Sequence, residues 1–509
     1  MMDKIGAVMV VGAGIGGSQA ALDLADSGLK VYLIETTTSI GGVMAQLDKT
    51  FPTNDCAMCI VSPKLVETGR HQNIDLSINC RIQEVSGEAG NFNIKVLKKT
   101  LHIDKEACTG CGVCGQKCPV EAIDLFNEGL SLSKATSVKY PQAVPLVYAI
   151  NKDYCIGCGV CEGVCKANAV QYDLQDELVE INVGAIILSP GFAEYIPPKG
   201  NVYGYGEFDN VVTSIEFERI LSASGPYSGK ILRPSDGDVP EKIAFLQCVG
   251  SRDVRDGQPY CSSVCCMYTA KEAVIAKEHM HQVNPTIFTM DIRAYGKDFD
   301  KYIERAREEY GVQYIRSRIS SITEIKETHD LKIQYETENN EIVEELFNMI
   351  VLAVGLYPPD DAQYLAETFG IELNQFDFAK TDVFNRVLTS IPGIFACGAF
   401  TSPKDIPDTV TQASAAAGCA GTILYDKRGT LITEKSLPPE IFVNGKPPRI
   451  GVFICHCGIN IGGTVDVPEV TKYAGMLPNV VLADRNLYTC SADTQTIIKE
   501  KIKEYNLNR

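Results

Sequence analysis

The sequence lacks several features, and each absence excludes a class of protein. No apolar run is long enough to span a bilayer, and the apolar stretch at the start leads into a glycine-rich turn without a cleavage site. No basic stripe occurs, and 64 acidic residues against 47 Lys and Arg give a net charge of −17. We therefore expect no transmembrane segment, no signal peptide, no nucleic-acid partner, and a cytoplasmic location.

Cysteine, in contrast, is abundant, with 20 residues in a chain of 509. Disulfides are rare in a reducing compartment, and these cysteines fall in tight groups. Metal ligation or redox chemistry is therefore the leading interpretation. The chain length suggests three or four domains, and the ordinary globular composition allows a core in each.

A dinucleotide-binding fingerprint opens the chain. The pattern G-x-G-x-x-G follows a predicted strand at 4–11 and precedes a predicted helix at 18–27, and a second predicted strand at 29–35 ends in an acid. Glycine lets backbone N–H groups approach a pyrophosphate at the helix N-terminus, and the acid can accept hydrogen bonds from ribose hydroxyls. The expected dinucleotide-binding residues are Gly12, Gly14, Gly17 and Glu35.

Two further motifs favour FAD over NAD. Ile40-Gly41-Gly42 follows the acid, and the stretch 393–398 (GIFACG) comes near the end of the catalytic core; both are typical of flavoproteins with two dinucleotide-binding domains. We expect Gly41, Gly42 and Gly398 to bind FAD, although Ala399 stands where those proteins usually have an aspartate. A second α/β block begins with a strand at 242–249 that lacks the glycine fingerprint, so we expect no nicotinamide dinucleotide there.

Two cysteine boxes with the spacing C-x2-C-x2-C-x3-C predict an iron–sulfur domain. The fourth cysteine of each box commonly ligates the other cluster, so the ligand sets should cross. Zinc is the alternative, and two such boxes in tandem argue against it. The first [4Fe–4S] set is Cys108, Cys111, Cys114 and Cys165. The second set is Cys155, Cys158, Cys161 and Cys118.

The other cysteines are less specific. Cys248, Cys261, Cys265 and Cys266 suit a soft-metal site, or they are buried free thiols. Cys56 and Cys59 could form a redox dithiol, ligate a cluster or be inert. The Cys-His-Cys-Gly motif supplies Cys455 and Cys457, which with Cys490 make three candidate ligands that need a fourth from Cys56 or Cys59. Cys80, Cys397 and Cys419 stand alone, and we expect them to pack in cores.

Four stretches resemble one family. The segments 51–59 (FPTNDCAMC), 247–253 (QCVGSRD), 260–267 (YCSSVCCM) and 403–408 (PKDIPD) are similar to signature stretches of the heterodisulfide reductase A-subunit (HdrA) family, and the resemblance extends over 5–425. It implies a thioredoxin-reductase-like FAD core with an inserted ferredoxin, a [4Fe–4S] cluster on the Cys248 group, and an FAD that splits electron pairs. It also implies that Lys404 lies near the flavin ring, where a cation favours the reduced, anionic flavin.

The predicted fold is therefore α/β: a thioredoxin-reductase-like, two-dinucleotide-binding flavoprotein with an inserted two-cluster ferredoxin domain and a small C-terminal α/β segment. The FAD-binding domain is expected at 1–100, 173–240 and 357–427. The other expected parts are a ferredoxin domain at 101–172, a cluster-bearing block resembling an NAD(P)H domain at 241–356, a linker at 428–448 and a partial Cys-His-Cys-Gly module at 449–509.

The expected function is electron transfer in a hetero-oligomeric complex. A hydrogenase or dehydrogenase would donate electrons, FAD would bifurcate them, and ferredoxin and a disulfide-reducing subunit would accept them. The alternatives are an NAD(P)H-dependent iron–sulfur flavoprotein reductase and a non-bifurcating wiring subunit. The order of modules departs from the family, because the Cys-His-Cys-Gly module follows the FAD core and no second ferredoxin is seen. The short C-terminal segment should complete itself against its own FAD core, a continuation of the chain or a second polypeptide, and we favour a companion polypeptide.

Overall fold

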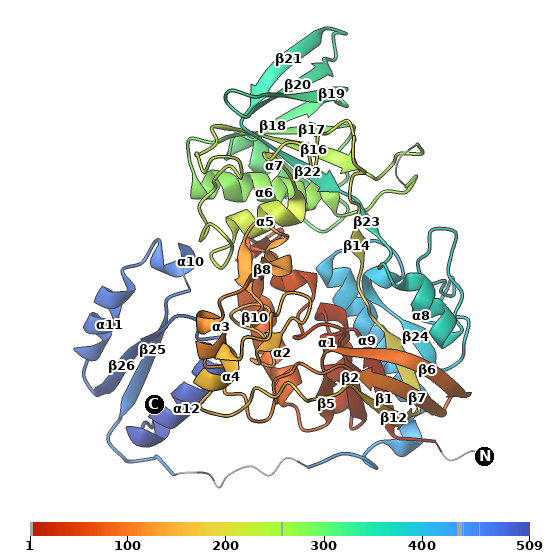
Figure 1. Ribbon diagram of the computed structural model, residues 1–509, viewed down its shortest axis with the longest axis vertical. Helices are drawn as coiled ribbons and strands as arrows, with labels where there is room; N and C mark the ends of the chain where they lie inside the picture. Colours follow the sequence, from red (N-terminus) through yellow and green to blue (C-terminus); the bar gives the residue numbers. More distant parts are fainter. Residues whose placement is uncertain (1–3, 256–257, 435–439, 441, 458) are drawn as a thin grey trace.

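The structure is a computed structural model that describes residues 4–255, 258–434, 440, 442–457 and 459–509. Figure 1 shows an FAD-type α/β part, a second α/β part above it, and the C-terminal segment packed at one side. Pro438 and Pro439 of the predicted linker, and Gly458 of the Cys-His-Cys-Gly motif, lie outside the described residues.

The first part is built on a five-stranded parallel sheet. Residues of β1 alternate between two cores: Val8 and Val10 face helices α1 (Ile15–Asp26) and α9 (Ile406–Ile423), while Met9 faces the other side. Both faces of the sheet are covered, which explains why its strands are almost wholly apolar. The strand order is β24 (Ile394–Ala396), β13 (Ala185–Leu188), β1 (Ala7–Val11), β2 (Lys30–Ile34) and β5 (Ile74–Ser77).

An antiparallel three-stranded sheet covers the other face of this part and carries the insertion. Strand β7 (Asn91–Lys98) pairs with β6 (Cys80–Glu88) and, along most of its length, with β12 (Glu177–Val183). Because β7 and β12 are neighbours, the chain can leave at Lys98 and return at Glu177 without disturbing the sheet. The inserted segment contains α3 (Val113–Lys117), α4 (Val160–Val164), β8 (Glu121–Ile123), β9 (Leu132–Lys134), β10 (Thr136–Ser137) and β11 (Ala149–Ile150).

The second part has a parallel sheet of its own. Alternate residues of β16 face two cores, one made with the helices and one with an antiparallel meander of three strands. The strand order is β15 (Val211–Thr213), β22 (Met349–Val354), β16 (Lys242–Val249), β17 (Asn284–Thr289) and β18 (Gln313–Arg316). The helices are α5 (Ser214–Leu221), α6 (Cys265–His279) and α7 (Phe299–Glu308), and the meander is β19 (Ser321–Ile325), β20 (Asp330–Glu336) and β21 (Ile342–Phe347).

Two short strands connect the parts. Strands β14 (Ala193–Glu194) and β23 (Leu356–Tyr357) pair antiparallel where the chain passes from one part to the other and back (Figure 1). Helix α8 (Ala362–Phe369) then packs against the antiparallel sheet of the first part.

The C-terminal segment forms a small α/β unit. Strands β25 (Ile450–Cys455) and β26 (Val480–Asn486) are parallel, with α10 (Ile459–Gly462), α11 (Val467–Gly475) and α12 (Ala492–Glu504) around them. Arg70, at the end of α2 (Ala57–Arg70), donates hydrogen bonds to Gln495 at 3.1 Å and to Thr496 at 3.3 Å. The segment therefore packs on the chain's own FAD part, which is one of the alternatives that we considered, and the companion polypeptide stays a prediction.

The predicted fold class is confirmed, with two α/β parts, each a parallel sheet with helices on one face and antiparallel strands on the other, and an insertion between β7 and β12. Within the described residues, no helix is long and apolar enough to cross a membrane.

Candidate flavin and iron–sulfur sites

The turn after β1 has the geometry of a phosphate-binding turn. Gly12 has φ +94°, and a Cβ on it would lie 2.2 Å from the Ser189 carbonyl oxygen. A Cβ on Gly17 would lie 1.8 Å from the Gly12 carbonyl oxygen. Helix α1 follows with Gly14 as its N-cap and no capping side chain, so its first N–H groups are available to an anion.

The second glycine motif lies directly beside this turn. The Gly41 N–H donates to the Ala13 carbonyl at 2.9 Å. A Cβ on Gly14 would meet only the Cα of Gly42, at 3.9 Å, so the space next to Gly14 is open. Two backbone segments thus form a cradle without side chains, and this cradle fits a dinucleotide pyrophosphate.

Glu35 is positioned by the same turn. Its carboxylate accepts hydrogen bonds from the Ala13 N–H at 2.9 Å and from the N–H and hydroxyl of Thr37, both at 2.9 Å. The Thr36 hydroxyl also donates to this carboxylate, at 3.4 Å, so Oε1 accepts three bonds and Oε2 accepts only the one from Ala13. An acceptor site on Oε2 therefore remains for a ribose hydroxyl.

Gly398 and Lys404 occupy one tight turn before α9. The Lys404 ammonium donates to the Gly398 carbonyl at 2.7 Å, to the Thr401 hydroxyl at 2.7 Å and to the Ser402 carbonyl at 2.9 Å. Burial lowers the pKa of Lys404 to about 8, and the nearby Cys397 and Asp408 oppose that shift. The Gly398 N–H donates to the Gln412 side-chain oxygen at 2.9 Å, a contact that sequence reasoning missed.

The two cysteine boxes adopt the same backbone conformation. Gly110 and Gly112 have φ values of 68° and 79°, and Gly157 and Gly159 have 69° and 75°. Helices α3 and α4, which carry the later cysteines of each box, pack against each other. This internal symmetry is what crossed ligation of two clusters requires.

The first predicted ligand set lies together. Burial, with smaller contributions from the close thiolates of Cys108, Cys111 and Cys165, raises the pKa of Cys114 to about 11. In the second set, Cys161 and Cys155 both lie close to Tyr172, and Cys118 is buried. Among the described residues, no group of His, Cys, Asp and Glu could hold a single metal ion.

The insertion contacts the loop that follows the FAD fingerprint. The Tyr140 hydroxyl donates a hydrogen bond to the Ile40 carbonyl, immediately before Gly41. The Gln46 amide donates to the Phe126 carbonyl at 3.1 Å. Among the box cysteines, Cys161 is buried in the core of the FAD part, and others pack against that core: Cys108, Cys114, Cys155 and Cys165. The candidate clusters therefore lie beside the candidate flavin site.

The third cysteine group meets at the carboxyl end of β16. Cys248 has φ +63°, where the pairing of β16 with β22 shifts register, and Cys265 and Cys266 begin α6. Burial raises the pKa of Cys266 to about 11, with further contributions from Cys248 and Cys261. Cys266 accepts a hydrogen bond from the Arg293 N–H at 3.3 Å, and Cys261 accepts one from the Ser263 N–H at 3.4 Å.

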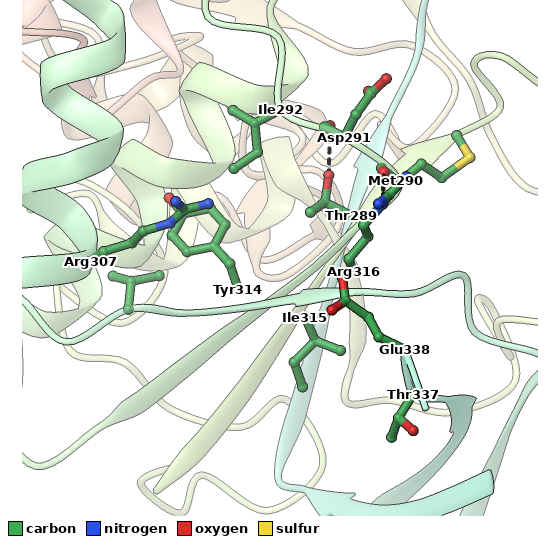
Figure 2. Close-up of a pocket in the computed structure, with 11 residues that line it drawn as sticks. Thr289, Met290, Asp291, Ile292, Arg307, Tyr314, Ile315, Arg316, Thr337 and Glu338 are labelled. Carbon is green, nitrogen blue, oxygen red and sulfur yellow. Dashed lines mark hydrogen bonds between the residues drawn. The ribbon is translucent and has the colours of Figure 1, made fainter. Parts of the chain in front are cut away.

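This group stands where an NAD(P)H domain would hold a pyrophosphate. The turn between the first strand and helix of the second sheet carries Cys265 and Cys266 in place of the glycine fingerprint. A cavity of about 790 Å³ lies beyond it at the ends of β17 and β18, and Figure 2 shows Arg307 beside Tyr314 and Asp291 near Thr289 in its wall. The absence of a nicotinamide dinucleotide from this block stays a prediction.

The C-terminal cysteines meet Cys56 and Cys59. Cys56 is the N-cap of α2, and hydrogen bonds, the largest from Cys457 and the next from Cys59, lower its pKa to about 3. Burial raises the pKa of Cys490, and the nearby thiolates of Cys455 and Cys56 also raise it. The Ser62 hydroxyl of α2 donates to the Cys490 carbonyl at 3.0 Å. Five thiols from two segments far apart in the sequence thus form one group.

One buried polar atom also marks this place. The Nδ1 atom of His456, between Cys455 and Cys457, is buried without a hydrogen-bond partner in the described part of the chain. Of the isolated cysteines, Cys80 and Cys397 are buried in cores and Cys419 is half-buried.

Family models match three parts of the chain. Residues 7–101 match the FAD-dependent oxidoreductases, and residues 262–417 match the pyridine nucleotide-disulphide oxidoreductases. Residues 101–124 and 148–171 each match the 4Fe–4S binding domain. These matches assign an FAD-binding domain and a 4Fe–4S domain to this chain, in agreement with the two candidate sites.

Relatives extend the similarity to most of the chain. The iron–sulfur A-subunit of a CoB–CoM heterodisulfide reductase from Methanopyrus kandleri is 48% identical over 83% of this chain and 65% of its own length. The A-subunit of an H2/formate:CoB-CoM heterodisulfide,ferredoxin reductase from Methanococcus maripaludis is 48% identical over 80% of this chain and 63% of its own length. This chain therefore spans less than two thirds of these relatives.

Solved structures are more distant. The thioredoxin reductase of T. acidophilum shares 15% identity with a TM-score of 0.47, covering 82% of this chain and 97% of that protein. Over the region that it shares with the curated relatives, the chain belongs to the family of heterodisulfide reductase A-subunits, HdrA.

Proposed function

We propose that this chain is an oxidoreductase, the FAD- and [4Fe–4S]-dependent electron-transfer subunit of a heterodisulfide reductase-like complex. The observation that carries the proposal is the contact between the insertion and the flavin loop, in which Tyr140 bonds the Ile40 carbonyl and Gln46 bonds the Phe126 carbonyl. Electron transfer between the flavin, which takes electron pairs, and the clusters, which take single electrons, requires that the two lie close together.

FAD supplies the exchange between pairs and single electrons, and the residues of this chain supply placement and electrostatics. The Lys404 ammonium, fixed by the Gly398 and Ser402 carbonyls, provides positive charge for the reduced flavin. The turn at Gly398 lies at the start of α9, next to the strand β24. Glu35 accepts from a ribose, and bare backbone for the pyrophosphate comes from Gly12, Gly14, Gly17, Gly41 and Gly42.

The cluster assignment has three parts that the geometry favours. Two [4Fe–4S] clusters bind the crossed sets of the insertion, and a third binds Cys248, Cys261, Cys265 and Cys266. For a fourth cluster, Cys455, Cys457 and Cys490 supply three ligands, and the group they form with Cys56 and Cys59 supports one of these two as the other ligand. The fifth thiol would then remain outside the cluster.

Within the complex, we propose that the flavin bifurcates. A hydrogenase or dehydrogenase partner delivers an electron pair, one electron passes to a disulfide-reducing subunit, and the other passes to ferredoxin. The name of the M. maripaludis relative combines heterodisulfide and ferredoxin reduction, which supports this division. The test is turnover of the purified complex with disulfide alone, ferredoxin alone and both together. Bifurcation requires that ferredoxin reduction stop when the disulfide is omitted.

An NAD(P)H-dependent reductase is the competing function, and the match to pyridine nucleotide-disulphide oxidoreductases at 262–417 favours it. Its distinguishing property is direct bleaching of the flavin by NADH or NADPH under anaerobic conditions. Our proposal predicts no bleaching by either, because cysteines occupy the pyrophosphate-binding turn. A wiring subunit without bifurcation would instead reduce ferredoxin whether or not the disulfide is present.

A further inference from the structure

The two halves of the insertion have the same backbone but different neighbours. A tyrosine lies beside each cysteine box. The Tyr148 ring covers the first box, since a Cβ on Gly112 would lie 2.9 Å from its hydroxyl oxygen and a Cβ on Gly115 2.8 Å from its ring. The Tyr172 hydroxyl oxygen lies 2.9 Å from the Cys161 sulfur in the second box. In the described part of the chain, no hydrogen bond joins the Tyr148 hydroxyl to a cysteine sulfur.

The direction of the Tyr172 bond follows from the chemistry of the ligand. A cysteine that ligates iron is a thiolate and has no proton, so the tyrosine hydroxyl must donate. A hydrogen bond to a ligand sulfur stabilises the reduced cluster, which carries one more negative charge, and therefore raises its reduction potential. The Lys152 ammonium, 5.6 Å from the centre of the Tyr172 ring, adds positive charge on the same side.

The two boxes also differ in solvent exposure, and the more exposed box is the second, which also carries the Tyr172 hydrogen bond. A Cβ on Gly110 would lie 2.9 Å from Leu146, and Leu146 also packs against the small core that contains Ala45 of the flavin loop. A Cβ on any of the glycines of the second box would meet no atom within 4 Å, and Ile156 beside them is 70% exposed. The loop of the first box is thus covered by Leu146 and Tyr148, whereas the loop of the second box is open. The cysteines of both boxes pack against the core of the FAD part, so the difference in exposure lies in the loops, and exposure is itself a determinant of cluster potential.

We propose that the Tyr172 hydroxyl raises the reduction potential of the cluster held by Cys155, Cys158, Cys161 and Cys118, and so makes that cluster the electron outlet of the insertion. This inference rests on the cluster assignment of the proposed function. Electrons from the flavin pass first to the covered cluster and then to the outer one, which holds them at the surface for a partner. Tyr172 acts only through its hydrogen bond to Cys161, which stabilises the reduced cluster, and it accepts no electron itself.

The test compares Tyr172→Phe with Tyr148→Phe in the full chain loaded with FAD and iron. Clusters are titrated with a chemical reductant and followed by electron paramagnetic resonance. In Tyr172→Phe, the ratio of reduced to oxidised cluster at the wild-type midpoint should fall about tenfold for one cluster, equal to about 59 mV for one electron. Tyr148→Phe should leave both midpoints unchanged. Unchanged midpoints in Tyr172→Phe, or equal shifts in the two variants, would overturn the proposal.

Iron content separates this inference from the proposed function. A wild-type chain without clusters would refute the cluster assignment, whereas normal iron with an unmoved midpoint refutes only the role of Tyr172. Should Tyr172→Phe lose its iron, the chain is produced with 3-fluorotyrosine, whose more acidic hydroxyl is a stronger donor. One cluster midpoint should then rise while the other stays, and two unmoved midpoints would reject the hydrogen bond as a determinant.

Discussion

At the scale of single residues, the fingerprint glycines have different tasks. Gly12 and Gly17 are required by the fold itself, because a Cβ on either would collide with backbone carbonyl oxygen. Gly14 is different, since a Cβ there would enter the open cradle and meet only Gly42, at 3.9 Å. Gly14 is therefore the position where a substitution separates FAD binding from folding.

We predict that Gly14→Val loses most of its bound FAD and keeps a wild-type circular dichroism spectrum and unfolding midpoint. The valine methyl groups fill the space that the pyrophosphate needs. Flavin absorbance after release from purified protein measures the outcome, with Gly418→Ala as a control at an open helix position. Full flavin content in Gly14→Val would disprove the assignment of this turn.

A second residue-scale prediction concerns Lys404. Lys404→Ala should lower the two-electron reduction potential of the flavin by about 30 mV, the equivalent of about 1.4 kcal/mol, because the anionic reduced flavin loses a cation. Burial lowers the lysine pKa to about 8, so the difference from wild type should be present at pH 7 and decline as the pH rises above 8. Lys404→Arg stays charged at pH 7 and above pH 8, so this variant should not show that decline.

Equal potentials for wild type and Lys404→Ala at pH 7, with normal FAD content, would place Lys404 away from the ring. The same pKa has a consequence for stability. Because the folded pKa is below the unfolded value of 10.5, the unfolded chain binds more protons between pH 8 and 10.5. The destabilising effect of burying this lysine is therefore complete below pH 8 and is relieved as the pH rises through that window.

At the scale of elements, the site depends on where strands end. The carboxyl end of β16 and the N-terminus of α6 bring Cys248, Cys265 and Cys266 together. Cys265→Ala should therefore remove about four irons per chain and leave the insertion clusters intact, by [4Fe–4S] stoichiometry. Iron analysis measures the loss, and Cys419→Ala, a half-buried cysteine outside every group, is the matched control. Identical iron content in the two variants would reject a third cluster.

Sequence patterns predicted many of these elements closely. The strand predicted at 242–249 has those bounds in the structure, because its residues are nearly all buried. The two 4Fe–4S boxes were also predictable, since their spacing is local, and the crossed ligand sets stay a prediction. The group of Cys56, Cys59 and the C-terminal cysteines was proposed only from the missing fourth ligand. Its position could not be derived from the sequence, because it depends on α12 packing against α2 across most of the chain.

At the scale of the whole molecule, buried polar contacts hold the second part against the first. Arg219 of α5 donates to the Gln46 carbonyl at 2.7 Å and to Asn127 of the insertion at 2.9 Å. Glu218, its neighbour, accepts from the Asp48 N–H at 2.9 Å and pairs with Lys271 of α6, and the side chains of this pair are both 2% exposed. Three segments therefore meet at one buried ion pair.

Lys271→Met should destabilise the chain by about 3–5 kcal/mol, because it leaves the Glu218 carboxylate buried without its cation. Chemical denaturation monitored by circular dichroism gives the change in the midpoint of the second part. Lys242→Met is the control, since Lys242 is 47% exposed in its pair with Glu345 and should cost less than about 1 kcal/mol. Equal effects of the two substitutions would show that the buried pair has no special role.

The central claim is that one chain combines a flavin with several clusters, and anaerobic quantitation of FAD and iron tests it most directly. For the full chain we predict one FAD with about 16 irons, and for a chain ending at residue 444 one FAD with about 12, because four [4Fe–4S] clusters become three. Equal iron contents in the two chains would reject the assignment of the C-terminal cluster and leave the rest of the account standing. A full chain that binds FAD with no iron, or iron with no FAD, would contradict the account as a whole.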